Sequence, residues 1–195
     1  MVKELSDMDA ELVLDPTFLP ATEDWINLAS TTKPGKKYIL CYYMLNKEIN
    51  REEMRIARMI SKKTGWEILH LGLREYRKFI FWEKHITDAG ISEFLGLVKN
   101  ASFVVTNSFH GCAFSVIFRR PFLAVTSTKH PLKSRIETLL NVFHLQNRIH
   151  YIENPDADFE NLLELDYSQK EDFIHQAQAQ SRSFLLNQIT EKTSD

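Results

Sequence analysis

Short apolar runs alternate along the chain with longer segments whose apolar residues recur at helical spacing. The runs are rich in β-branched and aromatic residues, which favours strands buried on both faces. They are Tyr38–Met44, Trp66–Leu71, Phe103–Thr106 and Phe122–Val125. Between two of them, Ile91, Phe94, Leu95 and Val98 have the i, i+3, i+4, i+7 spacing of an amphipathic helix. This alternation predicts an α/β fold, a Rossmann-like parallel sheet flanked by helices.

Helix starts and turns divide the rest of the chain. Three residue pairs have the spacing of a capping box, in which a polar residue and an acid three positions later close a helix N-terminus. They are Asn50 with Glu53, Ser134 with Glu137, and Ser168 with Glu171. Leu12–Leu14 predicts a short strand, Thr22 a helix cap, and Ile149–Ile152 a last strand. Residues 73–87 are the least regular stretch, and we interpret them as a loop lining a cleft.

Length and composition bound the class of protein. The 195 residues are 44% hydrophobic, which suits one domain with a substantial core. We expect residues 1–11 to be disordered or a linker and residues 12–195 to form a single Rossmann-like domain. The net charge of −2 lacks the polycationic signature of nucleic-acid binding. Cys41 and Cys112 both fall in apolar segments, which predicts buried free thiols in a reducing compartment.

Targeting features are missing from the sequence. No apolar run approaches the roughly 20 residues that span a bilayer. The first residues have no signal-peptide pattern. We therefore expect no transmembrane segment and a cytoplasmic location, peripheral at the inner face of the membrane.

The strongest candidate site is a polar elbow between a predicted strand and a predicted helix. The strand runs into Thr106, Asn107 and Ser108, the composition of a tight turn or a helix N-cap. A helix of apolar and small residues follows from Phe109 to Phe118. In parallel sheets, ligands bind outside the carboxyl ends of the strands, against helix N-termini whose free N–H groups favour anions.

The elbow carries side chains suited to acid–base chemistry. His110 can act as general acid or base, or donate a hydrogen bond to a phosphate or carboxylate. Gly111 would let a ligand approach the backbone closely. Asn107, Ser108 and Phe109 are the neighbouring candidates for contact with substrate. The alternative is that Asn107 and Ser108 only cap the helix and that His110 is a half-buried histidine with its hydrogen bonds satisfied.

Polar residues of the following strand and helix are expected at the same edge of the sheet. Arg135 could hold an anionic ligand with two parallel hydrogen bonds; the alternative is an exposed surface arginine. The further candidates for contact with substrate are Thr128, Lys129 and Ser134, with Thr126 and Ser127 beside them.

Several chemistries find no support in the sequence. There is no Gly-x-Gly-x-x-Gly or Gly-Lys-Ser/Thr loop for a dinucleotide or P-loop site. The other histidines are scattered singly without metal-ligand spacing. No Gly-x-Ser-x-Gly nucleophile elbow occurs, and Cys112 has no recognisable catalytic partner. We therefore expect neither a metal nor an acyl-enzyme.

The stretch Thr106–Phe122, with Ser-Phe-His-Gly and a downstream proline, resembles the polysaccharide pyruvyl transferase family. Weaker supporting stretches occur in the expected order. They are Val13–Leu19, Phe94–Ala101, Ser134–Leu140 and Leu145–Arg148. The resemblance covers the chain from about Leu12 to Arg148.

The resemblance implies a GT-B-like fold, in which two Rossmann-like domains face across a cleft. It implies transfer of the enolpyruvyl group of phosphoenolpyruvate onto a sugar as a pyruvate ketal, with no other cofactor. It makes His110 the proton donor or the phosphate-side contact, and places the anion at the helix N-terminus from Ser108 to Gly111. The implied partners are phosphoenolpyruvate, a sugar or lipid-linked saccharide acceptor, and an N-terminal domain or a dimer mate.

Two features depart from the family pattern. Several members have an arginine two places before the histidine, where this chain has Ser108. Donor binding then needs another cation, Arg135 or Lys129, or a different donor. The chain also accounts for one Rossmann-like domain, which we interpret as the C-terminal half of the family fold, with weak or absent turnover by itself.

Three functions follow as hypotheses. The first is a pyruvyl transferase half acting on a cell-surface polysaccharide precursor. The second is a GT-B-type glycosyltransferase half that binds a nucleotide sugar at the same elbow. The third is a non-catalytic remnant or binding module. An apolar face left bare by the other domain would favour self-association.

Overall fold

A six-stranded sheet, in the order β3-β2-β1-β4-β5-β6, forms the centre of the molecule, and all neighbouring strands are parallel. The computed structural model describes residues 11–31, 34–44, 46–72, 83–131, 133–154 and 160–191. The strands are β1 (Tyr38–Tyr42), β2 (Glu67–Leu71), β3 (Lys84–Ile86), β4 (Phe103–Thr106), β5 (Phe122–Thr126) and β6 (Ile149–Tyr151). This order confirms the predicted Rossmann-like sheet.

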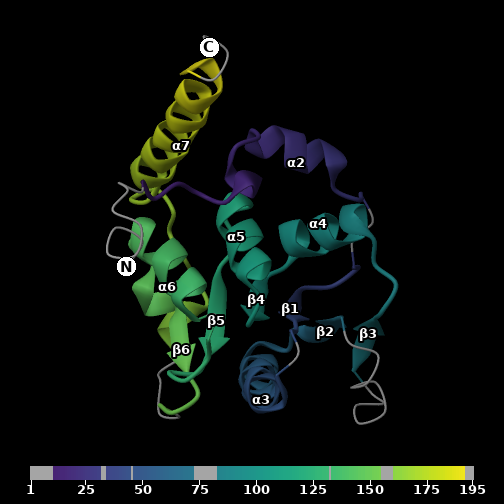
Figure 1. The fold of residues 1–195 in the computed structure, drawn as a ribbon. Helices are drawn as coiled ribbons and strands as arrows, with labels where there is room; N and C mark the ends of the chain where they lie inside the picture. The colour runs from purple at the N-terminus through teal and green to yellow at the C-terminus, as the bar shows by residue number, and fades with distance from the viewer. Residues whose placement is uncertain are drawn as a thin grey trace.

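Helices cover both faces of the sheet, which explains why β4 and β5 are buried along their whole length. On one face lies α3 (Lys47–Thr64); on the other lie α2 (Thr22–Leu28), α4 (Ile91–Asn100) and α5 (Phe109–Ile117) (Figure 1). Successive residues of β1 face opposite cores, with Ile39 and Cys41 turned toward α3 and Tyr38 and Leu40 turned away. Cys41 and Cys112 are free and buried, as predicted.

Helix α3 begins one turn earlier than the capping-box pattern predicts. Its N-cap is Asn46, whose side chain accepts a hydrogen bond from the Ile49 N–H at 3.1 Å. The prediction of Asn50 as the cap is therefore wrong, and Asn50 and Glu53 lie inside the helix. The predicted end at Gly65 is confirmed, because this residue takes the left-handed conformation, with φ of 72°.

The other two capping boxes are also wrong. Ser134 lies within α6 (Lys133–Val142) instead of preceding it. Ser168 donates its hydroxyl to Asp166 at 2.8 Å, and α7 (Glu171–Glu191) begins three positions later. The predicted cap Thr22 is likewise the first residue of α2, so Ala21 is the N-cap. The Ala21 N–H donates to the Asp24 carboxylate at 3.0 Å.

The N-terminal segment packs on α7 instead of forming the predicted strand. Leu14 donates its N–H to the Ser181 hydroxyl of α7 at 2.9 Å, so this donor is used in a contact with a helix and not in a sheet. A short 3₁₀ helix, η1 (Pro16–Phe18), follows and buries Phe18. Helix α7 continues beyond the body of the molecule (Figure 1).

The remaining predictions fall partly outside the described residues. Residues 1–10 and 73–82 are not described, so the expected linker and most of the expected cleft loop lie there. The end of that loop, Lys84–Ile86, is instead the edge strand β3. Among the described residues, no helix is both long enough and apolar enough to cross a membrane.

Candidate functional site

The elbow between β4 and α5 is held in shape by Thr106. Its hydroxyl donates to the Tyr42 carbonyl of the neighbouring strand β1 at 2.8 Å and accepts from the Ser108 N–H at 3.0 Å. Thr106 is fully buried. The two bonds fix the turn at the carboxyl edge of the sheet, where the first N–H groups of α5 have no acceptor within the helix.

Ser108 and Gly111 build the first turn of α5. Ser108 is the N-cap, is 4% exposed, and accepts from the Gly111 N–H at 3.4 Å. A Cβ on Gly111 would overlap Thr106, lying 2.9 Å from its Cγ2 and closer still to Oγ1. The structure thus gives Gly111 a role other than the predicted approach of a ligand: the missing side chain makes room for Thr106.

Asn107 connects three segments at the switch point of the sheet. Strands β1 and β4 are neighbours, but the chain leaves them toward opposite faces of the sheet. Parallel sheets bind ligands at such a switch point. The Asn107 Oδ1 accepts from the Met44 N–H, just after β1, at 2.7 Å. Its Nδ2 donates to Oδ1 of Asn50 on α3 at 2.8 Å. This side chain is thus engaged in holding the switch point together.

Arg135 and His110 each lie against Phe109. His110 is exposed in the first turn of α5, and its ring lies edge-on to that of Phe109, with centroids 5.5 Å apart. The guanidinium carbon of Arg135, on α6, lies 4.5 Å from the centroid of the Phe109 ring. A cation is therefore positioned beside the residue that precedes His110.

Thr128, Lys129 and Ser134 are not joined to the elbow. In the described part of the chain, no hydrogen bond or ion pair links any of the three to residues 107–111. Instead, the Glu153 carboxylate accepts from the Ser127 hydroxyl at 2.6 Å and from the N–H and hydroxyl of Thr128. These hydrogen bonds, led by that from Ser127, lower the pKa of Glu153 to about 2.

A buried polar pair on α3 lies behind the elbow. Asn50 and Glu53 are both fully buried. Within the described residues, neither carboxyl oxygen of Glu53 has a hydrogen-bond partner. Burial raises the pKa of Glu53 well above its ordinary value, while the main-chain N–H of Asn107 lowers it in part. Burial therefore favours the protonated form of Glu53. Both residues had been predicted only as a helix cap.

A second polar network holds the end of β1. The Tyr43 hydroxyl bonds to Nδ1 of His70, whose Nε2 bonds to the Glu83 carboxylate. Glu83 also accepts from Arg58 at 2.9 Å. Burial lowers the pKa of His70, and Glu83 opposes that shift. With a neutral imidazole, Nε2–H donates to Glu83 and Nδ1 accepts from Tyr43, so the chain of hydrogen bonds is complete.

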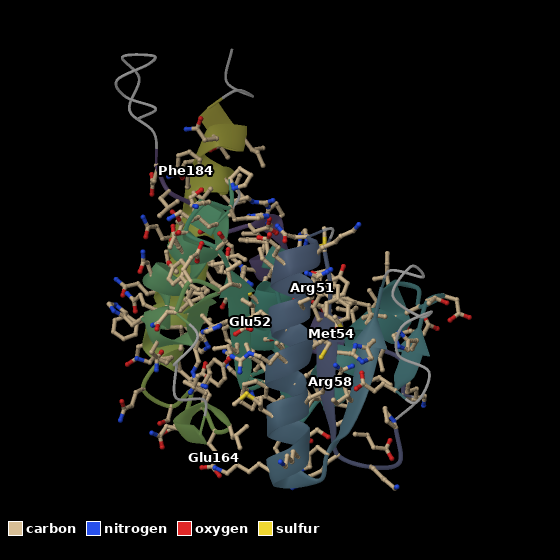
Figure 2. The ribbon with its side chains drawn as sticks, turned by 90° about the horizontal axis from the view of Figure 1, so that it is seen from below. Arg51, Glu52, Met54, Arg58, Glu164 and Phe184 are labelled. Atoms are coloured by element: carbon tan, nitrogen blue, oxygen red, sulfur yellow. The ribbon has the colours of Figure 1, made fainter. Side chains whose placement is uncertain are left out.

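Figure 2 shows α3 lying across the sheet, with Glu52 and Arg58 on opposite sides of the helix. Glu52 accepts from His150 of β6 at 2.8 Å, and Arg58 pairs with Glu83 beside β3. Polar contacts therefore fix α3 to both edges of the sheet.

Two pockets flank the elbow. One, of about 230 Å³, lies between residues 12–15 and α6 and is lined by Phe109 and Arg135. The other, of about 380 Å³, lies at the ends of β1, β2 and β3 and is lined by Tyr42 and Phe94. The elbow offers the first N–H groups of α5 and the exposed imidazole of His110, and the Arg135 guanidinium lines the smaller pocket. Such groups suit a small anion attached to a larger group. Among the described residues, no three histidine, cysteine or acidic side chains gather as metal ligands would.

Comparison with protein families and solved structures bears on this site. The model of the family described as polysaccharide pyruvyl transferase matches residues 2–129. No curated protein matches the chain in sequence.

Two solved structures share the fold. A UDP-GlcNAc 2-epimerase from Methanocaldococcus jannaschii has a TM-score of 0.54 and 14% identity, over 86% of this chain and 49% of the epimerase. S. aureus MnaA, solved with UDP, has a TM-score of 0.50 and 14% identity, over 86% of this chain and 45% of MnaA. The chain thus spans about half the length of these structures. Their likeness supports the predicted fold class.

Replacing Gly111 tests the packing of the elbow. We expect Gly111→Ala to lower the free energy of unfolding by about 1–3 kcal/mol, because Thr106 is buried and doubly hydrogen-bonded and cannot move aside. Urea denaturation measures the change. The matched control is Gly35→Ala, where nothing lies within 4 Å of the added Cβ; a loss as large in Gly35→Ala would contradict the steric argument.

Replacing Glu53 tests its protonation state. The folded chain keeps the Glu53 proton to a higher pH than the unfolded chain, so stability falls as pH rises, until Glu53 ionises in the folded state. We expect Glu53→Gln to remove a slope of up to about 1.4 kcal/mol per pH unit between about pH 7 and pH 8.

The measurement for Glu53 is urea denaturation at several pH values in that window. His70 contributes little there, because its lowered pKa acts below the ordinary histidine value. Glu52→Gln is the control, since the pKa of Glu52 is lowered, first by its bond to Arg55. Equal slopes in the unmodified chain and in Glu53→Gln would show that Glu53 is ionised.

Proposed function

The chain belongs to the polysaccharide pyruvyl transferase family, and we propose that it takes part in moving a pyruvyl group from phosphoenolpyruvate to a sugar of a cell-surface polysaccharide precursor. The observation that supports this is the exposed His110 at the N-terminus of α5, with Arg135 lying against the ring of the preceding Phe109. The helix N-terminus favours an anion, and both side chains can donate hydrogen bonds to it.

The proposed reaction forms a ketal. The methylene carbon of phosphoenolpyruvate takes a proton. The oxygen atoms of two sugar hydroxyls form bonds to C2 of phosphoenolpyruvate, and the bond between C2 and the phosphate oxygen breaks. The two hydroxyls release two protons, of which one balances the proton given to the methylene carbon and the other leaves with phosphate. His110 is proposed either to donate the proton to carbon or to hold the phosphate, since an imidazole does both.

Arg135 is the proposed replacement for the arginine that several family members have two places before the histidine. It lies against Phe109, so its guanidinium is held near the elbow and part of its ordering cost is met before ligand binds. Lys129 is the weaker candidate, because its described hydrogen bond joins its N–H to Ser127 within its own loop.

The acceptor side of the site is proposed to come from a second domain. The solved structures that share the fold are about twice as long as this chain. A sugar diol must be positioned against the donor for the reaction to proceed. We place that function on a domain facing the carboxyl edge of the sheet, in the same polypeptide or in a partner.

A nucleotide sugar is the second candidate ligand. MnaA, which shares the fold, was solved with UDP. In this chain the pocket lined by Tyr42 and Phe94 adjoins the elbow, because the Tyr42 carbonyl accepts from Thr106. Aromatic side chains suit the stacking of a planar base, and the α5 N-terminus would suit the phosphates.

Calorimetric titration with phosphoenolpyruvate distinguishes these functions. We expect binding that is weakened at least about tenfold by His110→Ala and by Arg135→Gln, since each removes a hydrogen bond to a charged ligand. His175→Ala is the control, because His175 is an exposed histidine on α7. Binding of UDP-GlcNAc but not of phosphoenolpyruvate would select the nucleotide sugar, and equal binding by all variants would place the donor elsewhere.

A further inference from the structure

Glu53 is a buried acid in a position where a helix normally carries an apolar residue. The buried apolar residues of α3 include Ile49, Ile56 and Ile60, and Glu53 lies in the same stripe, four positions after Ile49 and three before Ile56. It is 0% exposed, and within the described residues neither carboxyl oxygen is hydrogen-bonded. A fully buried polar group without a partner is rare and calls for an explanation.

The groups around Glu53 provide no positive charge. The groups that act on it are Cys41 of β1, Tyr43 just after β1, Cys112 of α5 and the main-chain N–H of Asn107 in the elbow. Burial raises the pKa of both thiols and of the Tyr43 phenol, so these groups stay neutral through the physiological range. No cation among the described residues stabilises an ionised Glu53.

Glu53 is also coupled to the first turn of α5. Asn107, whose N–H acts on the carboxyl group, directly precedes the N-cap Ser108. Cys112 belongs to the same first turn, because its N–H donates to the Ser108 carbonyl at 3.1 Å. The Asn107 side chain also donates to Oδ1 of Asn50 at 2.8 Å, three positions before Glu53, so the elbow is in direct contact with the part of α3 that carries Glu53.

We infer that Glu53 is a positioning residue of the anion site at the α5 N-terminus, which supports the elbow as a neutral acid and opposes anion binding when it ionises. This inference rests on the proposed function, since it requires an anion site at α5. An ionised Glu53 would attract the main-chain N–H of Asn107 more strongly than a neutral one, and it would place a negative charge behind the bound anion.

The coupling must act in both directions. If ionisation of Glu53 weakens anion binding, then a bound anion must raise the pKa of Glu53 by the corresponding amount. A purely structural role for Glu53, such as filling space beneath Asn107, predicts neither effect. The two effects therefore separate electrostatic positioning from packing.

The experiment uses sulfate, a tetrahedral dianion whose charge does not change between about pH 6 and pH 9.5. Amide chemical shifts of residues 108–111 report binding to the full chain by NMR. We expect sulfate affinity to fall about five- to tenfold as Glu53 ionises, and the profile of Glu53→Gln to be flat. His110→Gln, measured alone and together with Glu53→Gln, removes the imidazole from the comparison.

A carboxyl-carbon NMR titration of Glu53 in the unmodified sequence gives an independent measurement, in case Glu53→Gln does not fold. We expect saturating sulfate to raise the Glu53 pKa by the amount that the affinity change requires. The matched control is Glu52→Gln on the same helix, whose carboxyl group is bonded to Arg55 and His150. This variant should keep the unmodified pH profile.

The outcomes separate this inference from the proposed function. Two outcomes would overturn the role of Glu53 alone. In the first, sulfate binds at residues 108–111 but does not change the pKa of Glu53; in the second, the Glu53 carboxyl group does not titrate up to about pH 9.5. Absence of sulfate shifts at these residues in the unmodified chain would overturn the anion site, and with it both proposals.

Discussion

The side-chain amide of Asn107 is the interaction on which the candidate site depends. At the switch point, the chain leaves β1 and β4 toward opposite faces of the sheet, and the pairing of the two strands ends at Tyr42 and Thr106. One amide group bonds to Met44 after β1 and to Asn50 on α3. The N-terminus of α5 thus has a fixed position relative to both halves of the sheet.

Most polar residues of the elbow are occupied in building it. Thr106 is engaged with Tyr42 and Ser108, and Asn107 with Met44 and Asn50. What remains for a ligand is the backbone of the first turn of α5, His110 and Arg135. An anion site of this kind is rigid because its supporting side chains are not themselves ligands, which reduces the ordering cost of binding.

The strands β1, β2, β4, β5 and β6 and the helices α4 and α5 could be predicted because their apolar residues follow simple periods and their ends carry strong turn residues. The short edge strand β3, Lys84–Ile86, carries no such pattern, so the sequence predicts a loop there. That Asn46, and not Asn50, caps α3 could not be predicted. Asn46 and Asn50 both have the chemistry of a helix cap, and tertiary contact between Asn50 and Asn107 decides which of them caps α3. One pattern did point to Glu53: its place in the stripe with Ile49, Ile56 and Ile60 predicts burial. The closeness of Arg135 to Phe109 needs the packing of α6 on α5, which spacing along the chain does not reveal.

Ser108 stands where several members of the family have an arginine, and Arg135 is the proposed replacement for that arginine. The residue at position 108 is the N-cap, where a serine oxygen satisfies one of the free N–H groups of the helix. A long cationic side chain at this buried position would leave the cap unmade and would have to turn outward to reach a ligand. In the proposed site the two tasks are separate, because Ser108 closes α5 and the cation that would bind the anion is Arg135 on α6. A cation on a neighbouring helix needs a support of its own, and the Phe109 ring provides it.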